Sequence, residues 1–200
     1  MKTDFTGFVL AGGKSSRMGA DKFGLSIGGV TFLTRAARAL SAVCETVKIV
    51  LNQTQDVETP FPFVRDVYPN RGALGGIHAA LRDCPTKFAV VLAVDLPFVS
   101  SAALENLAAL ALAANKFPAI VPRQTGGKAQ PLCAAYRAKY CVPALEQLLN
   151  ENEAASVMDF LDLIAPKYVD ASRLSADENL LSNVNFPADF EAARKLLAGK

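Results

Sequence analysis

The sequence has few of the residues that bind structural metals or build disulfide frameworks. It contains one histidine and four cysteines, and no two cysteines form a C-x-x-C pair. These residues are His78, Cys44, Cys84, Cys133 and Cys141. A structural zinc site needs about four closely paired Cys and His ligands, so the sequence does not predict one. We expect free, mostly buried thiols, as is usual in a reducing compartment, and a packing role for the histidine.

Long apolar segments and an excess of one charge are absent as well. The most continuous apolar run, residues 88–94, is far shorter than the ~20 residues that a membrane-spanning helix needs. The N-terminus shows no signal-peptide pattern, so we expect a cytoplasmic protein that binds no membrane. Lys and Arg number 21 and Asp and Glu number 19, for a formal net charge of +2, which argues against binding to nucleic acid.

Short strand-like runs alternate with helix-like segments along the chain. The 200 residues, 51% hydrophobic and 20% charged, fit one sizeable α/β domain. Strands are predicted at 7–10, 46–51, 61–64, 87–94, 118–122 and 130–136 and near Tyr168, and helices at 31–44, 73–81, 100–114, 142–150, 155–163 and 188–198. This alternation predicts a single three-layer α/β/α domain with a mostly parallel, Rossmann-like sheet.

The strongest local motif follows the first predicted strand and reads LAGGKSSRMGADK, residues 10–22. Glycines let backbone N–H groups approach an anion and form a phosphate-sized nest, and ligands of α/β sheets bind where strands end. Lys14, Arg17 and Lys22 add positive charge. We expect phosphate binding at the start of this loop, at Leu10, Ala11, Gly12 and Gly13. The Walker A and G-x-G-x-x-G motifs are absent, which excludes a P-loop hydrolase.

A carboxylate and two cations form the predicted catalytic set. Asp95 follows the most apolar predicted strand, so its side chain should emerge at the same sheet edge as the glycine loop. A hard oxygen ligand there suits Mg²⁺, which bridges protein carboxylates and nucleotide phosphates. Lys22 is expected to neutralise phosphate charge, with Arg17 assisting, while the substrate's own phosphate attacks. The alternative for Asp95 is a helix N-cap, although it lies several residues before the helix expected at Ser100.

Other polar residues are expected near the same edge. Asn52 and Asp66 end the second and third predicted strands, where they could bind a nucleotide or stabilise turns. In the second half, Asn183 and Asn185 could bind a second substrate, complete a metal shell or form an asparagine turn, and Gln130 could face the second substrate.

In order along the chain, these motifs resemble those of the molybdenum cofactor guanylyltransferases, the MobA family. The segment 10–22 is similar to the family's signature loop, and Asp95-Leu96-Pro97-Phe98 resembles its D-x-P-[FY] motif. The matching segments are 50–52, 64–66, 72–76 and 183–185, and the resemblance covers residues 7–190. Ala73 stands where proline is usual and Val94 where many members have cysteine, and neither change removes a functional side chain.

The resemblance implies a fold like that of the nucleotide-diphospho-sugar transferases, with a nucleotide-binding half at 5–115 and an acceptor-binding half at 116–200. It implies Mg²⁺-dependent transfer of GMP from GTP to the molybdopterin cofactor with release of pyrophosphate, and a nucleotide-binding role for Asn52 and Asp66. By analogy, molybdenum-insertion proteins and target molybdoenzymes are transient partners.

Two alternatives remain open. One is a related cytidylyltransferase that acts on the same cofactor or another phosphorylated acceptor. Those relatives more often have alanine at the position of Gly12, so the Gly12-Gly13 pair favours GTP. The other is a non-catalytic module that binds and delivers the cofactor, against which the presence of both Lys22 and Asp95 argues.

Overall fold

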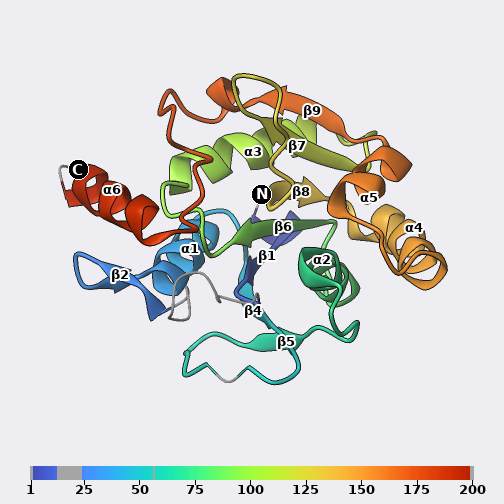
Figure 1. The fold of residues 1–200 in the computed structure, drawn as a ribbon. Helices are drawn as coiled ribbons and strands as arrows, with labels where there is room; N and C mark the ends of the chain where they lie inside the picture. Colours follow the sequence, from blue (N-terminus) through green and yellow to red (C-terminus); the bar gives the residue numbers. More distant parts are fainter. Residues whose placement is uncertain (1, 13–23, 56, 199–200) are drawn as a thin grey trace.

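The fold is organised around one sheet of seven strands in the order β5-β4-β1-β6-β8-β7-β9 (Figure 1). The computed structural model describes residues 2–12, 24–55 and 57–198. The strands of the sheet are β1 (Phe5–Leu10), β4 (Thr46–Leu51), β5 (Phe63–Arg65), β6 (Phe88–Ala93), β7 (Ala119–Arg123), β8 (Cys133–Tyr136) and β9 (Lys167–Asp170). β8 pairs antiparallel with β6 and β7, and the other pairings are parallel. The predicted mostly parallel sheet is therefore confirmed.

Helices cover both faces of this sheet and complete the three predicted layers (Figure 1). They are α1 (Phe32–Ser41), α2 (Gly72–Arg82), α3 (Ser101–Ala113), α4 (Ala138–Glu151), α5 (Val157–Ile164) and α6 (Pro187–Ala198), with short 3-10 turns η1 (Lys2–Asp4) and η3 (Ala171–Arg173). Residues of α1, α3 and α6 share one apolar core with one face of the sheet, and residues of α2, α4 and α5 share a second core with the other face. Among the described residues, no helix is long and apolar enough to cross a membrane.

Local sequence signals explain where several helices begin. Thr31 caps α1 and Ser100 caps α3, and their hydroxyls accept hydrogen bonds from the backbone N–H groups of Thr34 and Ala103. α5 begins with a capping box in which Ser156 and Asp159 bond reciprocally. Such caps satisfy N–H groups that the first turn of a helix leaves without partners.

The thiols match the prediction from composition. All four cysteines are free, and Cys44, Cys133 and Cys141 are buried while Cys84 is half-buried. Burial raises the pKa of Cys44, Cys133 and Cys141 to about 12. These cysteines therefore contribute apolar packing and are not reactive thiolates.

Some predicted boundaries are wrong. The helix predicted at 142–150 begins earlier, at Ala138, because the N–H of Cys141 bonds to the carbonyl of Arg137 (3.1 Å) and the Cys141 side chain is buried. The strand predicted at 130–136 begins only at Cys133, whose N–H bonds to the carbonyl of Gln130 (3.2 Å) and closes a turn. A two-stranded hairpin, β2 (Ser26–Ile27) and β3 (Val30–Thr31), was not predicted at all.

Candidate active site

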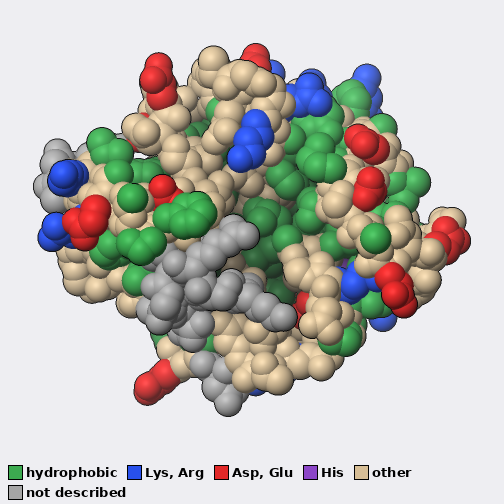
Figure 2. Space-filling view, viewed as in Figure 1, with side chains coloured by type: hydrophobic (Ala, Val, Ile, Leu, Met, Phe, Trp, Pro, Cys, Tyr) green, Lys and Arg blue, Asp and Glu red, His purple; other side chains and the backbone are tan. Residues whose placement is uncertain are grey.

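The carboxyl ends of β1, β4, β5 and β6 surround a cavity of about 600 Å³. Its lining includes Gly12, Asn52, Asp66 and Asp95, which follow these four strands in that order, together with Leu10 at the end of β1. The view in Figure 2 shows a hollow on the corresponding face, with hydrophobic side chains at its floor. The structure therefore brings Leu10, Gly12, Asn52, Asp66 and Asp95 together, whereas Ala11 is buried and does not line the cavity. Gly13, Lys14, Arg17 and Lys22 lie outside the described residues.

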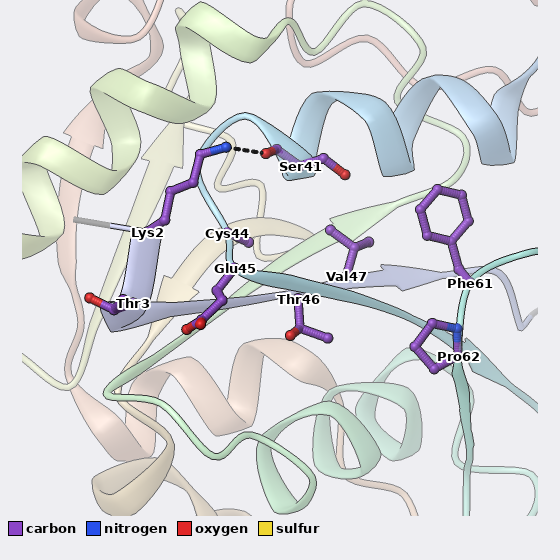
Figure 3. Close-up of a pocket in the computed structure, with 9 residues that line it drawn as sticks. All are labelled: Lys2, Thr3, Ser41, Cys44, Glu45, Thr46, Val47, Phe61 and Pro62. Atoms are coloured by element: carbon purple, nitrogen blue, oxygen red, sulfur yellow. Dashed lines mark hydrogen bonds between the residues drawn. The ribbon is translucent and has the colours of Figure 1, made fainter.

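A second cavity, of about 580 Å³, lies at the opposite edge of the sheet, where β1 and β4 begin. Figure 3 shows Lys2 donating from Nζ to the carbonyl oxygen of Ser41 (2.8 Å), with Cys44 nearby and Phe61 and Pro62 at the opposite side of the lining. It contains none of the predicted site residues. Ligands of parallel sheets bind at the carboxyl ends of strands, so we assign the site to the first cavity.

The start of the glycine loop is fixed against β4 by backbone hydrogen bonds. The N–H groups of Ala11 and Gly12 both donate to the carbonyl of Val50 (3.1 and 3.2 Å). A Cβ atom on Gly12 would lie 3.3 Å from the backbone nitrogen of Asn52, which is tighter than most real Cβ contacts. Glycine thus lets the loop leave β1 in close contact with the end of β4.

The segment after β4 forms a firm wall of the cavity. The Oδ1 atom of Asn52 accepts hydrogen bonds from the backbone N–H (3.0 Å) and hydroxyl (3.3 Å) of Thr54, so Asn52 stabilises a turn as well as lining the cavity. Arg65 Nη1 donates to the carbonyls of Asn52, Gln53 and Gln55 (3.0, 3.3 and 2.9 Å). Arg65 was not predicted as a site residue. It donates to backbone carbonyls, and because every residue has one, the sequence carries no signal for this contact.

Asp66 lies directly against α2. Its Oδ1 accepts the backbone N–H of Tyr68 (2.7 Å), and a Cβ on Gly75 would lie only 2.4 Å from its Oδ2. Gly75 is therefore what allows the carboxylate and the helix to be in contact. Burial raises the pKa of Asp66, against the opposing effects of the Tyr68 hydrogen bond and the nearby His78.

The raised pKa of Asp66 predicts a stability change at this site. A carboxyl whose pKa is raised by folding binds its proton more tightly in the folded state, so its charge opposes folding at neutral pH. Asp66→Asn keeps an acceptor for the Tyr68 N–H and should raise the free energy of unfolding at neutral pH. The gain should shrink as the pH falls and the wild-type carboxyl becomes protonated. Denaturant unfolding at about pH 7.5 and about pH 4 measures both effects, and a variant less stable at neutral pH would contradict this prediction.

The sole histidine lies behind this part of the site. The His78 ring is buried and makes an edge-on contact with Tyr68, with ring centroids 4.7 Å apart. Its Nε2 lies 3.4 Å from Glu146 Oε1. These contacts join α2 to α4 and to the segment after β5, which is the packing role expected from the sequence.

Asp95 is held by residues from the second half of the chain. Its Oδ1 accepts a hydrogen bond from Asn183 Nδ2 (3.1 Å), and its backbone carbonyl accepts one from Val184 N–H (2.9 Å). Gln130 Nε2 donates in turn to Asn183 Oδ1 (3.0 Å). The alternative role of Asp95 as a helix cap is wrong, because the hydroxyl of Ser100 caps α3.

The donor atoms at this edge suit one kind of metal. In the described part of the chain, no three His, Cys, Asp or Glu side chains gather closely enough to enclose a metal ion. The Asp95 carboxylate offers hard oxygen ligands, and the Asn183 amide beside it directs its NH₂ group, not its oxygen, toward Asp95. Mg²⁺ is commonly bound through one or two carboxylates plus substrate phosphates and water, so these residues fit Mg²⁺ and not zinc.

Comparison with known proteins identifies the family. The family model described as the MobA-like NTP transferase domain matches residues 7–166. A Pelotomaculum thermopropionicum protein named "Probable molybdenum cofactor guanylyltransferase" is 35% identical over 196 residues, which cover 94% of this chain and 91% of that protein. A Syntrophotalea carbinolica protein named "Molybdenum cofactor guanylyltransferase" is 32% identical over 193 residues, covering 94% and 89%.

Solved structures agree with this match. The molybdopterin-guanine dinucleotide biosynthesis protein A of Archaeoglobus fulgidus has a TM-score of 0.82 and 25% identity, covering 98% of this chain and 100% of that chain. The 2-C-methyl-D-erythritol 4-phosphate cytidylyltransferase of Thermus thermophilus, with a TM-score of 0.69 and 15% identity over 96% and 98%, shares the fold. By sequence and by fold, the chain belongs to the MobA-like NTP transferase family and is a nucleotidyltransferase.

Proposed function

We propose that this protein transfers GMP from GTP to the terminal phosphate of molybdopterin, forming the guanine dinucleotide form of the molybdenum cofactor and releasing pyrophosphate. One observation carries the proposal: four strands end at one cavity and present Gly12, Asn52, Asp66 and Asp95 to it. The names of the relatives supply the guanine and molybdenum cofactor assignments.

Within this proposal the guanine base lies beside Asp66. The Asp66 carboxylate would accept hydrogen bonds from two N–H groups of the guanine edge, which cytosine and uracil do not match in shape. Tyr68 N–H already holds Oδ1 of this carboxylate, and Gly75 leaves it room against α2, so it is oriented before a ligand arrives. Asn52 lines the cavity, and the hydrogen bond from Arg65 to its backbone carbonyl restrains this segment.

The phosphates would lie between the glycine loop and Asp95. The rest of the glycine loop, with Arg17 and Lys22, would neutralise and position them, a role that rests on the sequence, because the N–H groups of Ala11 and Gly12 bond to the Val50 carbonyl instead. Asp95 would hold Mg²⁺, which supplies further charge neutralisation at the phosphates. No residue of the chain needs to become a nucleophile, because the acceptor's own phosphate attacks.

The proposal extends to the setting of the reaction. Molybdopterin is expected to approach from the second half of the chain, where Asn183 meets the end of β6. A cytoplasmic location and transient contacts with molybdenum-insertion proteins and target molybdoenzymes follow from this role.

Nucleotide choice tests the proposal directly. Titration of the protein with GTP, CTP and ATP in the presence of Mg²⁺ should give the tightest binding with GTP. With molybdopterin present, GTP alone should support release of pyrophosphate. A preference for CTP would instead establish the related cytidylyltransferase, and tight GTP binding with no pyrophosphate would establish a binding and delivery module.

A further inference from the structure

A chain of hydrogen bonds reaches Asp95 from a buried glutamine. Gln130 Nε2 donates to Asn183 Oδ1 (3.0 Å), and Asn183 Nδ2 donates to Asp95 Oδ1 (3.1 Å). The three residues are far apart in sequence: Gln130 and Asn183 are 53 positions apart, and Asn183 and Asp95 are 88 positions apart. They meet because the turn before β8 and the segment before α6 both reach the carboxyl end of β6.

Gln130, the first residue in this series of hydrogen bonds, is buried and is held at its backbone. Gln130 is one of the few buried polar residues of the described part of the protein, with 7% of its surface exposed. Its backbone N–H bonds to the carbonyl of Pro122 (2.8 Å), and its carbonyl accepts the N–H of Cys133 (3.2 Å). Burying a side-chain amide is unfavourable unless the amide is hydrogen-bonded. The hydrogen bond to Asn183 therefore stabilises the buried Gln130 side chain.

The hydrogen bond from Gln130 determines which end of the Asn183 amide faces Asp95. An amide NH₂ group can only donate, so Gln130 Nε2 occupies the oxygen of the Asn183 amide. The NH₂ end of Asn183 must then face Asp95, where it donates to Oδ1. A flipped Asn183 amide would place two oxygens together at Asp95 and two NH₂ groups together at Gln130, and both hydrogen bonds would be lost.

We propose that Gln130 is a positioning residue that acts through Asn183 to hold the Asp95 carboxylate in the orientation that binds the metal. The inference rests on the proposed function, because it takes Asp95 as the Mg²⁺ ligand. Residues that hydrogen-bond to a metal ligand typically change metal affinity by about tenfold or more when they are removed. Gln130 would exert such an effect without contacting metal or nucleotide.

The experiment measures how much the metal strengthens nucleotide binding. A GTP analogue with a non-hydrolysable α–β linkage is titrated calorimetrically into the full-length protein, once with Mn²⁺ and once with EDTA. The ratio of the two affinities is the metal enhancement. Gln130→Met should lower this enhancement about tenfold and leave the affinity measured in EDTA unchanged. Gln130→Glu, which offers no NH₂ donor, should show the same loss and serves if the methionine variant does not fold.

A double-mutant cycle separates positioning from general support of the fold. If Gln130 acts through Asn183, then Gln130→Met should cause no further loss in the Asn183→Ala background. The matched control is Gln124→Met, because Gln124 Nε2 donates to the carbonyl of Leu181 (2.8 Å) in the same segment but does not contact Asn183. This control should retain the full enhancement.

The outcomes are distinct. Equal losses in the Gln130 and Gln124 variants, or losses that multiply in the double mutant, would overturn the positioning role. A wild-type protein that binds the analogue without any metal enhancement would overturn the metal role of Asp95 as well. A wild-type protein that does not bind the analogue at all would overturn the proposed function itself.

Discussion

Replacing Asp95 with alanine should lower the rate of GMP transfer on the order of a thousandfold while leaving the fold intact. Groups that stabilise developing charge in a site typically have effects of this size. The fold should persist because the backbone carbonyl of residue 95 accepts the N–H of Val184, in the segment before α6. Alanine retains this carbonyl. Pyrophosphate release in the presence of GTP, Mg²⁺ and molybdopterin measures the rate, and thermal unfolding checks the fold.

A carboxylate elsewhere on the surface provides the control for this variant. Asp83 Oδ2 accepts a hydrogen bond from Lys48 Nζ (2.6 Å), and Asp83 does not line the cavity. Asp83→Ala removes the same charge and should retain near wild-type turnover. Wild-type turnover in the Asp95 variant would show that this residue has no role in the reaction.

Gly75→Ala should weaken GTP binding by about tenfold to a hundredfold, the range expected when a hydrogen bond to a charged group is lost. The added Cβ would lie 2.4 Å from Oδ2 of Asp66 and 2.7 Å from Oδ1, so the carboxylate must move. Alanine also favours a helix over glycine by about 1 kcal/mol, so helix propensity alone should stabilise the variant. Calorimetric titration with GTP and Mg²⁺ measures the affinity.

The neighbouring glycine separates this steric effect from a general effect of the substitution. Gly76 lies in the same turn of α2, and a Cβ there would meet Leu10 side-chain atoms at 3.6 Å, an ordinary contact. Gly76→Ala should therefore reduce GTP affinity much less than Gly75→Ala. Equal losses in the two variants would contradict the role of Gly75 in giving Asp66 room.

Much of the site could be predicted because parallel strands end at the same edge of a sheet. Asn52, Asp66 and Asp95 each follow a strand that the apolar pattern locates within two residues, so their meeting follows from the fold class. Their individual contacts do not follow from it. Asn52 bonds to a residue two positions away, Thr54. Asp66, in contrast, has room only because Gly75, on α2, has no Cβ.

Interactions between distant segments could not be predicted. Arg65 donates to backbone carbonyls, which leave no sequence pattern. Gln130 was expected to lie in a strand, and the direction of β8 was not foreseen, because a short apolar run looks the same in either direction. Because β8 is antiparallel, the turn before it places Gln130 within reach of Asn183. The Gln130–Asn183 contact therefore appears only in the structure.

The reversed direction of β8 has a consequence for how this protein can diversify. Cys133, at the start of β8, pairs with Leu92 near the end of β6, so the connection from β7 joins β8 at the edge of the sheet that holds the cavity. The tip of that connection contains Gly126 and Gly127, both with positive φ, and its residues are exposed. Exposed turns tolerate insertion and replacement. Evolution or engineering can therefore change this tip while the sheet register that positions the residues lining the cavity stays as it is.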